Sequence, residues 1–462
     1  MKTTNWQLLL AALALSLAAC GGSDGGSSAD ATDTQDPTPA TDTSTDSTDT
    51  DTVDAGDSTD TGSTDTDTVD TTAKRTIVLS NGSATLDGAA VPAYDYVWSL
   101  APDNIDEVFT GTAPSGSDAV YIARDIRYYP SLPTSGFIKV QYDDEQEWAY
   151  YYTAAGYTDY IFGTLPAEGY QNSPPSSMMH TASEAYANPV LHITQAGTYT
   201  LQGSWTGQIN VDLGDDAFTD ENAKVTLILD GVTVNCFVAP ALIFKNVFEA
   251  DNTWEEQTSW TYDVDTSNAG ANVIISDGST NTFSGTNVYR LLKPQYKSGS
   301  TSVQKKRLKT DGAFYSYVSM NITGGSAGTG VLNISSSYEG LDTDLHLTIN
   351  GGTVNITADE DGINVNEDGV SVFTLNGGTL NVTSAVGDGI DSNGWIVIND
   401  GSGTIQGGTA NYGMDSDRGV YIFGGSLNVS SAENVIVNNG SGTIGTTVNM
   451  GDMGGGTPPS MF

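Results

Sequence analysis

The chain has 462 residues, and its 57 acidic against 16 Lys and Arg residues give it a formal net charge of −41 at pH 7. This balance excludes a nucleic-acid-binding protein, because such binding depends on neutralising phosphate groups with Lys and Arg. Between Lys309 and the C-terminus the only basic residue is Arg418. So acidic a surface is expected to attract cations, with adaptation to salt as the alternative explanation.

The first 20 residues, MKTTNWQLLLAALALSLAAC, have the form of a signal peptide. One lysine precedes an apolar run too short for a stable membrane span, and small residues precede the expected processing site. Because Cys20 follows Leu17-Ala18-Ala19, the segment resembles a lipoprotein signal, in which Cys20 becomes the acylated N-terminus. The alternative is an ordinary signal peptide with an incidental cysteine. Acylation would anchor the protein to a membrane through lipid alone, and we expect the outer-membrane surface of the cell envelope, facing the exterior.

Further segments differ sharply in composition. Residues 21–73 are almost entirely Ser, Thr, Asp and Gly, so they can bury little apolar surface and should form a disordered tether. Residues 74–189 are rich in Tyr and Trp and are expected to form an N-terminal β-rich cap or appended subdomain. Residues 190–450 are assigned to a repeat domain, and residues 451–462 to a flexible tail. No disulfide framework is available, and Cys236 is expected to be a buried apolar residue.

From about Val318 onward the chain repeats one short alternating strand, in the versions VLNISS, TVNITA, TLNVTS, TANYG and SLNVSS. Gly-Gly pairs mark the turns into most of these strands, at Gly351-Gly352, Gly377-Gly378, Gly407-Gly408 and Gly424-Gly425. The apolar residues form two columns, which are Leu332, Val354, Leu380, Ala410 and Leu427, and Ile334, Ile356, Val382, Tyr412 and Val429. Alternation puts an Asn column on the opposite face, made of Asn333, Asn355, Asn381, Asn411 and Asn428.

The length of the repeat indicates the architecture. Self-similarity at intervals of about 22 to 30 residues is typical of a solenoid. Alternating strands joined by Gly, Asn and Asp turns, without helical periodicity, favour a β-solenoid whose coils stack about 4.8 Å apart. The predicted fold class is therefore all-β, with ends that must be capped against edge-to-edge association.

The order of motifs along residues 190–448 resembles a known family. These motifs are LHITQAGTYTLQGSWTGQINVDL, KVTLILDGVTVN, NVIISDGSTNTFSG, KTDGAFYS, LTINGGTVNIT and GDGIDSNG. They are similar to bacterial carbohydrate-binding β-helix lipoproteins, which share the fold of pectate lyases, bind calcium and act as polysaccharide-binding surface proteins. The resemblance implies a right-handed parallel β-helix and a polysaccharide partner, cellulose-like or acidic and pectic. It does not explain the Tyr-rich region or the insertion DNTWEEQTSWTYDVDTSNAG.

The repeats also carry acids in two columns. When the motifs SSYEGLDT, ADEDGINV, VGDGIDSN and TANYGMDS are aligned on their glycine, the next residue points to the core in each case, namely Leu341, Ile363, Ile390 and Met414. The position after that forms a column of Asp342, Asn364, Asp391 and Asp415. The position before the glycine forms another, of Asp311, Glu339, Asp361, Asp388 and then Tyr412.

Carboxylates stacked in two columns repel one another unless a positive charge lies between them. Carboxylates about 5 Å apart repel by roughly 3 kcal/mol at an effective dielectric of 20. One Ca²⁺ can bridge oxygens of neighbouring coils, because its Ca–O distances are about 2.3–2.6 Å. The predicted calcium ligands are Asp311, Glu339, Asp342, Asp361, Asn364, Asp388, Asp391 and Asp415. The alternative is that Asp and Asn only form the turns. Zinc and copper are not expected, since the region has only His346 and no cysteine.

A monomeric, non-enzymatic polysaccharide-binding protein is the predicted function, and other classes stay open. A β-helix lyase needs a Lys or Arg base, and the only such residues near the acidic columns are Arg418 and Lys309. The alternative role of Arg418 is an ion pair with its neighbouring aspartates. A polygalacturonase-like hydrolase could use Asp388, Asp391 and Asp415. A calcium-dependent adhesin fits the tether equally well. The Asn column could bind glycan hydroxyls or simply form a hydrogen-bonded ladder. The predicted glycan contacts are Tyr338, Trp395, Arg418 and Tyr421.

Overall fold

The computed structural model describes residues 74–100, 107–125, 137–141, 148–152, 182–250, 261–286, 312–433, 435–438 and 443–444. Cys20, the tether and the tail lie outside these ranges. Strands make up nearly all of the regular structure, which otherwise contains the short helix α2 (Ala182–Ala187) and a 3₁₀ turn, η4 (Ala217–Thr219). None of the helices within these ranges has the length and apolar character needed to cross a membrane.

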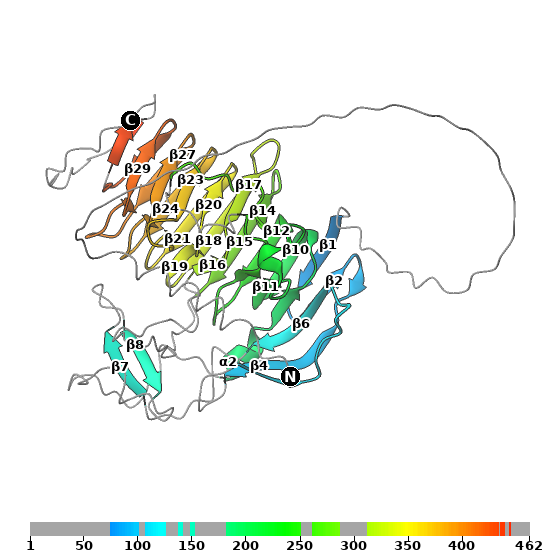
Figure 1. Ribbon diagram of the computed structural model, residues 1–462. Coiled ribbons are helices and arrows are strands. Elements are labelled where there is room, and N and C mark those ends of the chain that lie inside the picture. The colour runs from blue at the N-terminus through cyan, green and yellow to red at the C-terminus, as the bar shows by residue number, and fades with distance from the viewer. Residues whose placement is uncertain are drawn as a thin grey trace, which may run out of the picture. The chain divides into compact units, whose positions relative to one another are not determined.

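Parallel strands stack in three rows, which together form a β-helix (Figure 1). We call the three rows the strap face, the ladder face and the acidic face. The strap face contains β14 (Ala271–Ile275), β17 (Met320–Gly324), β20 (Leu347–Ile349), β23 (Val372–Leu375), β26 (Trp395–Ile398), β29 (Gly419–Ile422) and β31 (Val435–Asn438). The ladder face contains β15 (Thr280–Gly285), β18 (Val331–Ser336), β21 (Thr353–Ala358), β24 (Thr379–Ser384), β27 (Ser402–Gln406), β30 (Ser426–Val429) and β32 (Thr443–Ile444).

The third row is the acidic face, which belongs to a separate 11-stranded sheet. Its helical part contains β9 (Val190–Ile193), β11 (Gln208–Asp212), β13 (Leu242–Asn246), β16 (Gly312–Ser316), β19 (Glu339–Thr343), β22 (Ile363–Val365), β25 (Ile390–Ser392) and β28 (Met414–Ser416). The long strands β10 (Gly197–Thr206) and β12 (Val225–Asn235) begin the other two rows, since β12 pairs with both β14 and β15.

The region before residue 190 continues the sheets of the β-helix. Strand β1 (Lys74–Ser80) pairs in parallel with β10, and β6 (Val120–Asp125) pairs antiparallel with β9. The remaining strands are β2 (Ser83–Leu86), β3 (Ala89–Ala90), β4 (Ala93–Leu100), β5 (Glu107–Gly111), β7 (Phe137–Gln141) and β8 (Trp148–Tyr152). Of these, β7 and β8 form a two-stranded sheet of their own.

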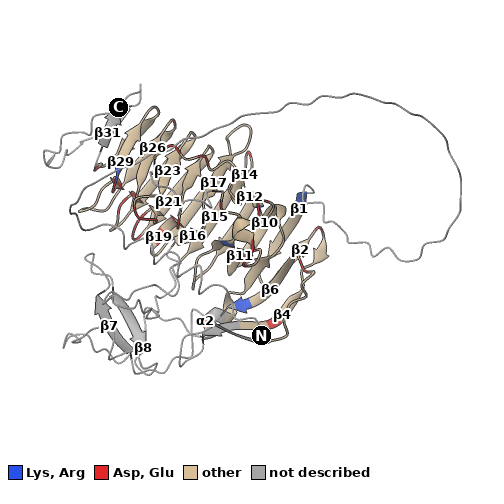
Figure 2. Ribbon diagram, viewed as in Figure 1, with Lys and Arg blue, Asp and Glu red and all other residues tan. Residues whose placement is uncertain are grey.

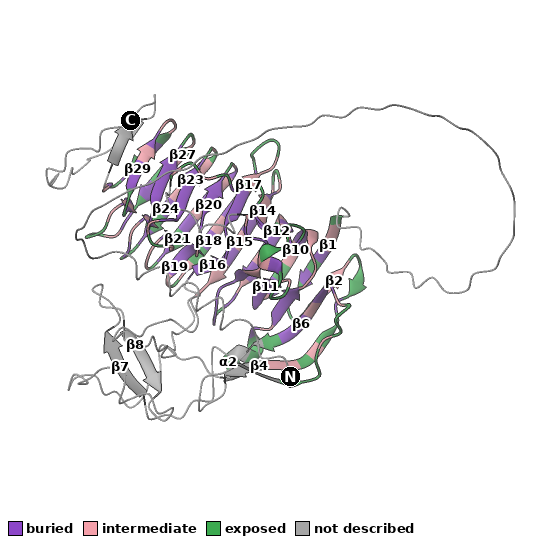
Figure 3. Ribbon diagram, viewed as in Figure 1, coloured by how far each residue is buried: buried purple, intermediate pink, exposed green. Residues whose placement is uncertain are grey.

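The core runs along the inside of the coils (Figure 3). Successive coils place like residues on one another, as in the register Leu332, Val354 and Leu380. The residues predicted to follow the repeat glycine are all buried, namely Leu341, Ile363, Ile390 and Met414. Cys236 is also buried, as predicted.

The assignment of TANYG to the repeated strand is wrong. The coil after β24 continues in β27, so that Leu380 pairs with Gly403, Asn381 with Thr404 and Val382 with Ile405. Ala410, Asn411 and Tyr412 lie instead in the turn that leads to β28, and Gly407-Gly408 belongs to the same turn. The strand SGTIQ was missed because Gly403 replaces the first apolar residue of the repeat and Thr404 replaces its Asn.

Candidate functional site

The acidic face carries a column of polar side chains, one from each coil. Asp342 pairs with Asn364, Asn364 with Asp391 and Asp391 with Asp415. Adjacent strands lie about 4.8 Å apart, so these side chains recur at about that spacing. Asp342 is fully buried and Asn364 is 8% exposed, whereas the two later aspartates are half-buried. Figure 2 shows acidic residues gathered beside β19 and in the coils toward β29.

The residues before the repeat glycines form a second column beside the first. The amide of Gly340 donates to the carbonyl of Asp361, and that of Gly362 donates to the carbonyl of Asp388, so successive turns stack. Glu339 connects the columns, because its Oε1 accepts a hydrogen bond of 3.2 Å from Asn364 Nδ2. The carboxylate of Asp361 in turn accepts a 2.6 Å bond from the Asp388 amide.

This crowding changes the acidity of Asp361. Burial raises the pKa of its carboxyl group well above the usual value, and repulsion from Asp391, Glu339 and Asp388 raises it further. The hydrogen bond from the Asp388 amide acts in the opposite direction and is outweighed. At Asp361, burial and three neighbouring acids therefore disfavour the ionised form.

The donors of this face fit a hard divalent cation such as Ca²⁺, which prefers carboxylate and amide oxygens. Asn364 Oδ1 is buried and accepts no hydrogen bond, so one ligand oxygen of the column is available. Among the described residues no group of three or more His, Cys, Asp and Glu side chains has the geometry of a metal site. Calcium binding by the two columns therefore stays a prediction.

The alignment of Asp311 with this column is off by one residue. Strand β16 pairs Gly312 with Glu339 and Tyr315 with Asp342, so Gly312 occupies the coil position that was assigned to Asp311. Asp311 itself lies outside the described residues. The misalignment arose because KTDGAFYS contains the Asp-Gly pair of the repeat one position early in the strand.

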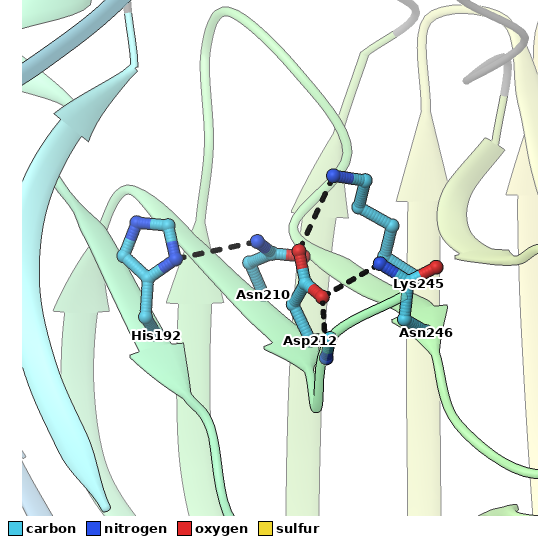
Figure 4. Close-up of polar contacts among 6 residues, drawn as sticks. His192, Asn210, Asp212, Lys245 and Asn246 are labelled. Atoms are coloured by element: carbon cyan, nitrogen blue, oxygen red, sulfur yellow. Dashed lines mark hydrogen bonds and ion pairs between the residues drawn. The ribbon is translucent and has the colours of Figure 1, made fainter. Parts of the chain in front are cut away.

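The N-terminal end of the same sheet carries a polar cluster that the sequence did not reveal (Figure 4). Lys245 Nζ lies 3.2 Å from Asp212 Oδ2, and Asn246 Nδ2 donates a 2.7 Å bond to Asp212 Oδ1. On the same strand as Asp212, Asn210 lies with its Nδ2 3.3 Å from Nδ1 of His192 on β9. These contacts join β9, β11 and β13. The three strands come from separate segments of the sequence, so no single motif predicts that they are neighbours.

The ion pair fixes the charge state of Asp212. Burial by itself would raise the pKa of this carboxyl group, but Lys245 and the hydrogen bonds from Asn246 and Gly214 outweigh burial and lower it. Lys245 is therefore the ion-pair partner of a half-buried carboxylate on the neighbouring strand. Arg418 and Lys309 were the two cations considered above as a lyase base, and Lys309 lies outside the described residues.

The ladder interpretation is confirmed for Asn333, Asn355 and Asn381 of the predicted Asn column. Asn355 Nδ2 donates to Asn333 Oδ1 at 2.9 Å, and Asn381 Nδ2 donates to Asn355 Oδ1 at 2.9 Å. The chain of bonds ends where the Thr404 amide donates to Asn381 Oδ1. Because these amides bond to one another along the ladder face, they stabilise the stacking of coils, and Asn355 and Asn381 each use one N–H donor within the protein.

The structure separates the predicted glycan contacts. Tyr338 is half-buried next to Glu339 on the acidic face. Trp395 differs from the expectation of an open platform, since it is only 8% exposed and packs against Val372 and Val397. Arg418 forms no ion pair with any described residue, contrary to the alternative given above, and its guanidinium lies 5.5 Å from the Trp395 ring centroid. Tyr421 lies on the strap face.

These features define a class of protein: an all-β parallel β-helix with one acid-rich face. The chain belongs to the family described as carbohydrate-binding domain-containing proteins, whose model matches residues 187–448. No curated protein sequence matches the chain. A solved structure of a polysaccharide lyase-like protein from C. thermocellum (a gadolinium derivative) is 22% identical, with a TM-score of 0.37, and the match covers 57% of this chain and 88% of that one.

Proposed function

We propose that the protein is a calcium-dependent polysaccharide-binding protein anchored to the outer surface of the cell envelope. The observation that carries the proposal is the pair of in-register columns on the acidic face, in a chain that belongs to a carbohydrate-binding family. A protein this acidic repels acidic sugars, so a cation is needed between the face and such a ligand.

Six residues of the columns have a part in this proposal. Asp342, Asp391 and Asp415 supply carboxylate oxygens at the strand spacing, and Asn364 supplies its buried amide oxygen. Glu339 and Asp361 supply carboxylates from the neighbouring column. Calcium, when bound, offsets the repulsion among these groups and presents a positive charge to the carboxylate or hydroxyl oxygens of a glycan.

We expect glycan binding that calcium supports and a chelator weakens. The measurement is a glycan array probed with the purified protein in 2 mM calcium and again in excess EDTA. Retention of polysaccharide in calcium, without release of sugar fragments, supports a binding protein. Equal binding in both conditions would rule out calcium dependence.

A glycoside hydrolase is the second candidate, favoured by one observation. The raised pKa of Asp361 suits a general acid, and Asp391 and Asp388 are ionisable groups beside it. New reducing ends released from polygalacturonate would support this candidate, and unsaturated ends would instead indicate a lyase. In either case the Asp361→Asn variant should lose the activity if Asp361 is the acid.

Anchorage is tested separately. We expect the Cys20→Ser protein to leave the membrane fraction, because it can no longer be acylated and one or two acyl chains supply most of the membrane affinity. The measurement is the share of protein in membrane and soluble fractions, with Cys236→Ser as the matched control. Retention of the Cys20→Ser protein in the membrane fraction would contradict the lipoprotein assignment.

A further inference from the structure

The insertion between β13 and β14 returns to the β-helix as a strap, residues 261–270, across the strap face. Thr266 Oγ1 donates a hydrogen bond of 2.7 Å to Asn321 Oδ1 on β17 and accepts one of 2.7 Å from the Thr348 hydroxyl on β20. Further along the strap, Val264 and Tyr262 pack against the cluster of Val372, Trp395 and Val397. The strap therefore crosses consecutive coils from β29 back to β14.

The strap follows a single column of outward-facing residues. These are Asn272, Asn321, Thr348, Thr374, Val397 and Tyr421, in register from β14 to β29. Five strand spacings amount to about 24 Å, which is also the reach of about seven extended residues. The column is polar where it faces Thr266 and apolar where it faces Val264 and Tyr262, so the strap and the face are matched in chemistry.

At its far end the strap completes an aromatic patch, which we define as Tyr262, Tyr421 and Phe423. The rings of Tyr262 and Tyr421 are stacked with centroids 4.2 Å apart, and Phe423 lies 6.3 Å from Tyr421 at an interplanar angle of 14°. All three side chains are half-buried. Rings held this way expose part of an apolar surface without the freedom to turn away from it.

A positive charge lies beside Trp395, a neighbour of the patch. Arg418 is exposed and its guanidinium lies over the indole of Trp395, which packs in one cluster with the patch. It also lies against the backbone of Gly369, where an added Cβ would stand 2.5 Å from Arg418 Nη2. In a chain with a net charge of −41, this arginine is positioned by an aromatic ring and a glycine, and no described carboxylate pairs with it.

We propose that the aromatic patch and Arg418 form a second glycan contact, which binds a chain of sugars that carry carboxylates and requires no metal. The apolar face of one sugar would lie on the exposed parts of Tyr262 and Phe423. The carboxylate of another sugar in the same chain would accept hydrogen bonds from the guanidinium, whose planar fork suits that group. The inference rests on the proposed polysaccharide-binding function and adds a site on another face of the β-helix.

Two properties favour an anionic sugar over other occupants. The exposed guanidinium provides charge complementarity to a carboxylate, and its stacking on Trp395 leaves the N–H donors at its edge available. The patch is also built from rigid rings, so little side-chain entropy is lost when a ligand binds. Tyr262 could serve only to hold the strap on the β-helix. That role explains the stacking of Tyr262 on Tyr421, but it does not explain why Arg418 is exposed beside Trp395.

The test compares polygalacturonate with its methyl ester, in excess EDTA and 150 mM salt. We expect chelated wild-type protein to bind both, and Arg418→Gln to weaken binding of polygalacturonate about tenfold or more, as the loss of a charge-assisted hydrogen bond does. The same variant should leave binding of the methyl ester unchanged. Phe423→Ala should weaken binding of both about three- to tenfold. Lys74→Gln, which removes one exposed charge on β1, is the matched control, and melting curves establish that each variant is folded.

The outcomes separate this inference from the proposed function. If polygalacturonate binds in calcium and not at all in EDTA, the metal-independent contact is wrong and the proposed function stands. If calcium has no effect while Arg418→Gln and Phe423→Ala lose binding, the contact stands and calcium dependence fails. Equal losses in Arg418→Gln and Lys74→Gln overturn the contact, because net charge alone would then explain them. Absence of binding to either polymer in every condition overturns both.

Discussion

Replacing Gly362 by Ala is expected to destabilise the β-helix by about 3 kcal/mol or more, the upper range for overpacking a core. Gly362 belongs to the glycine column that aligns the repeats. A Cβ at this position would lie 2.0 Å from Val382 Cγ1 and 2.6 Å from the carbonyl oxygen of Gly389. Neither atom can move freely, since one is a packed β-branched side chain and the other belongs to the backbone of the next coil.

The same constraint recurs in every coil of the column. At Gly340 an added Cβ would meet Ile356 Cγ2 at 2.3 Å, and at Gly389 it would meet the carbonyl oxygen of Gly413 at 2.5 Å. The glycine is thus required by the close approach of successive turns, and the acids around it are additional to that requirement. Relief of one clash would force apart two coils that hydrogen-bond through these same peptides.

The measurement is the free energy of unfolding in guanidinium chloride, together with the thermal midpoint. Gly116→Ala is the matched control, because an added Cβ there meets no atom within 4 Å and the backbone is not in the left-handed region. We expect the thermal midpoint of Gly362→Ala to fall by roughly 5–10 °C and that of Gly116→Ala to stay within about 1 °C. Equal midpoints would show that the coils can separate without cost.

Much of the fold could be predicted from the sequence because each coil repeats the same local rule. The alternation in TVNITA fixes which residues point inward, and the glycine before Ile363 fixes the register between coils. The prediction failed at SGTIQ, where Gly403 and Thr404 pair with Leu380 and Asn381 in spite of their different chemistry. At SGTIQ the register is set by pairing with the neighbouring coils, and the sequence of this one strand gives no information about that pairing.

The candidate sites were predictable only where their residues recur with the repeat. Asp342, Asn364 and Asp391 lie in one column, as the alignment indicated. The ion pair of Lys245 with Asp212 and the crossing of the strap over Thr348 depend on contacts between segments that are distant in sequence and share no motif. Trp395 was assigned to the surface because the sequence does not show that the strap covers its neighbours.

The Asp361→Asn variant is expected to be more stable than the wild type when calcium is absent and to gain less from calcium when it is added. Asp361 is repelled by three neighbouring acids, namely Asp391, Glu339 and Asp388. Removing one charge from such a group should stabilise the metal-free protein at pH 7 by roughly 1–3 kcal/mol, the range of one like-charge contact between bulk water and an effective dielectric of 20. The Asn oxygen can still accept the hydrogen bond that the Asp388 amide now donates to Asp361.

The effect should depend on pH in a defined direction. The pKa of Asp361 in the folded protein is raised above its unfolded value near 3.8, so the folded form holds the proton more tightly. The stability contributed by this group is fully present below the unfolded pKa and is lost as the pH rises through the folded pKa. The advantage of Asp361→Asn should therefore be largest at neutral pH and vanish as the pH falls toward 4.

Calcium is expected to reverse the order of stability of the two proteins. Binding of one ion at 100 times its Kd stabilises the folded form by about 2.7 kcal/mol. Wild-type protein should show this gain at millimolar calcium, whereas Asp361→Asn should show less of it, since it has lost one charged ligand. The measurement is the thermal midpoint of both proteins between pH 4 and pH 7, with EDTA or calcium. Asp359→Asn, which removes an exposed charge two residues away, is the control. If calcium shifts neither midpoint, the columns of the acidic face serve the turns alone, and the repulsion at Asp361 is left uncompensated in the working protein.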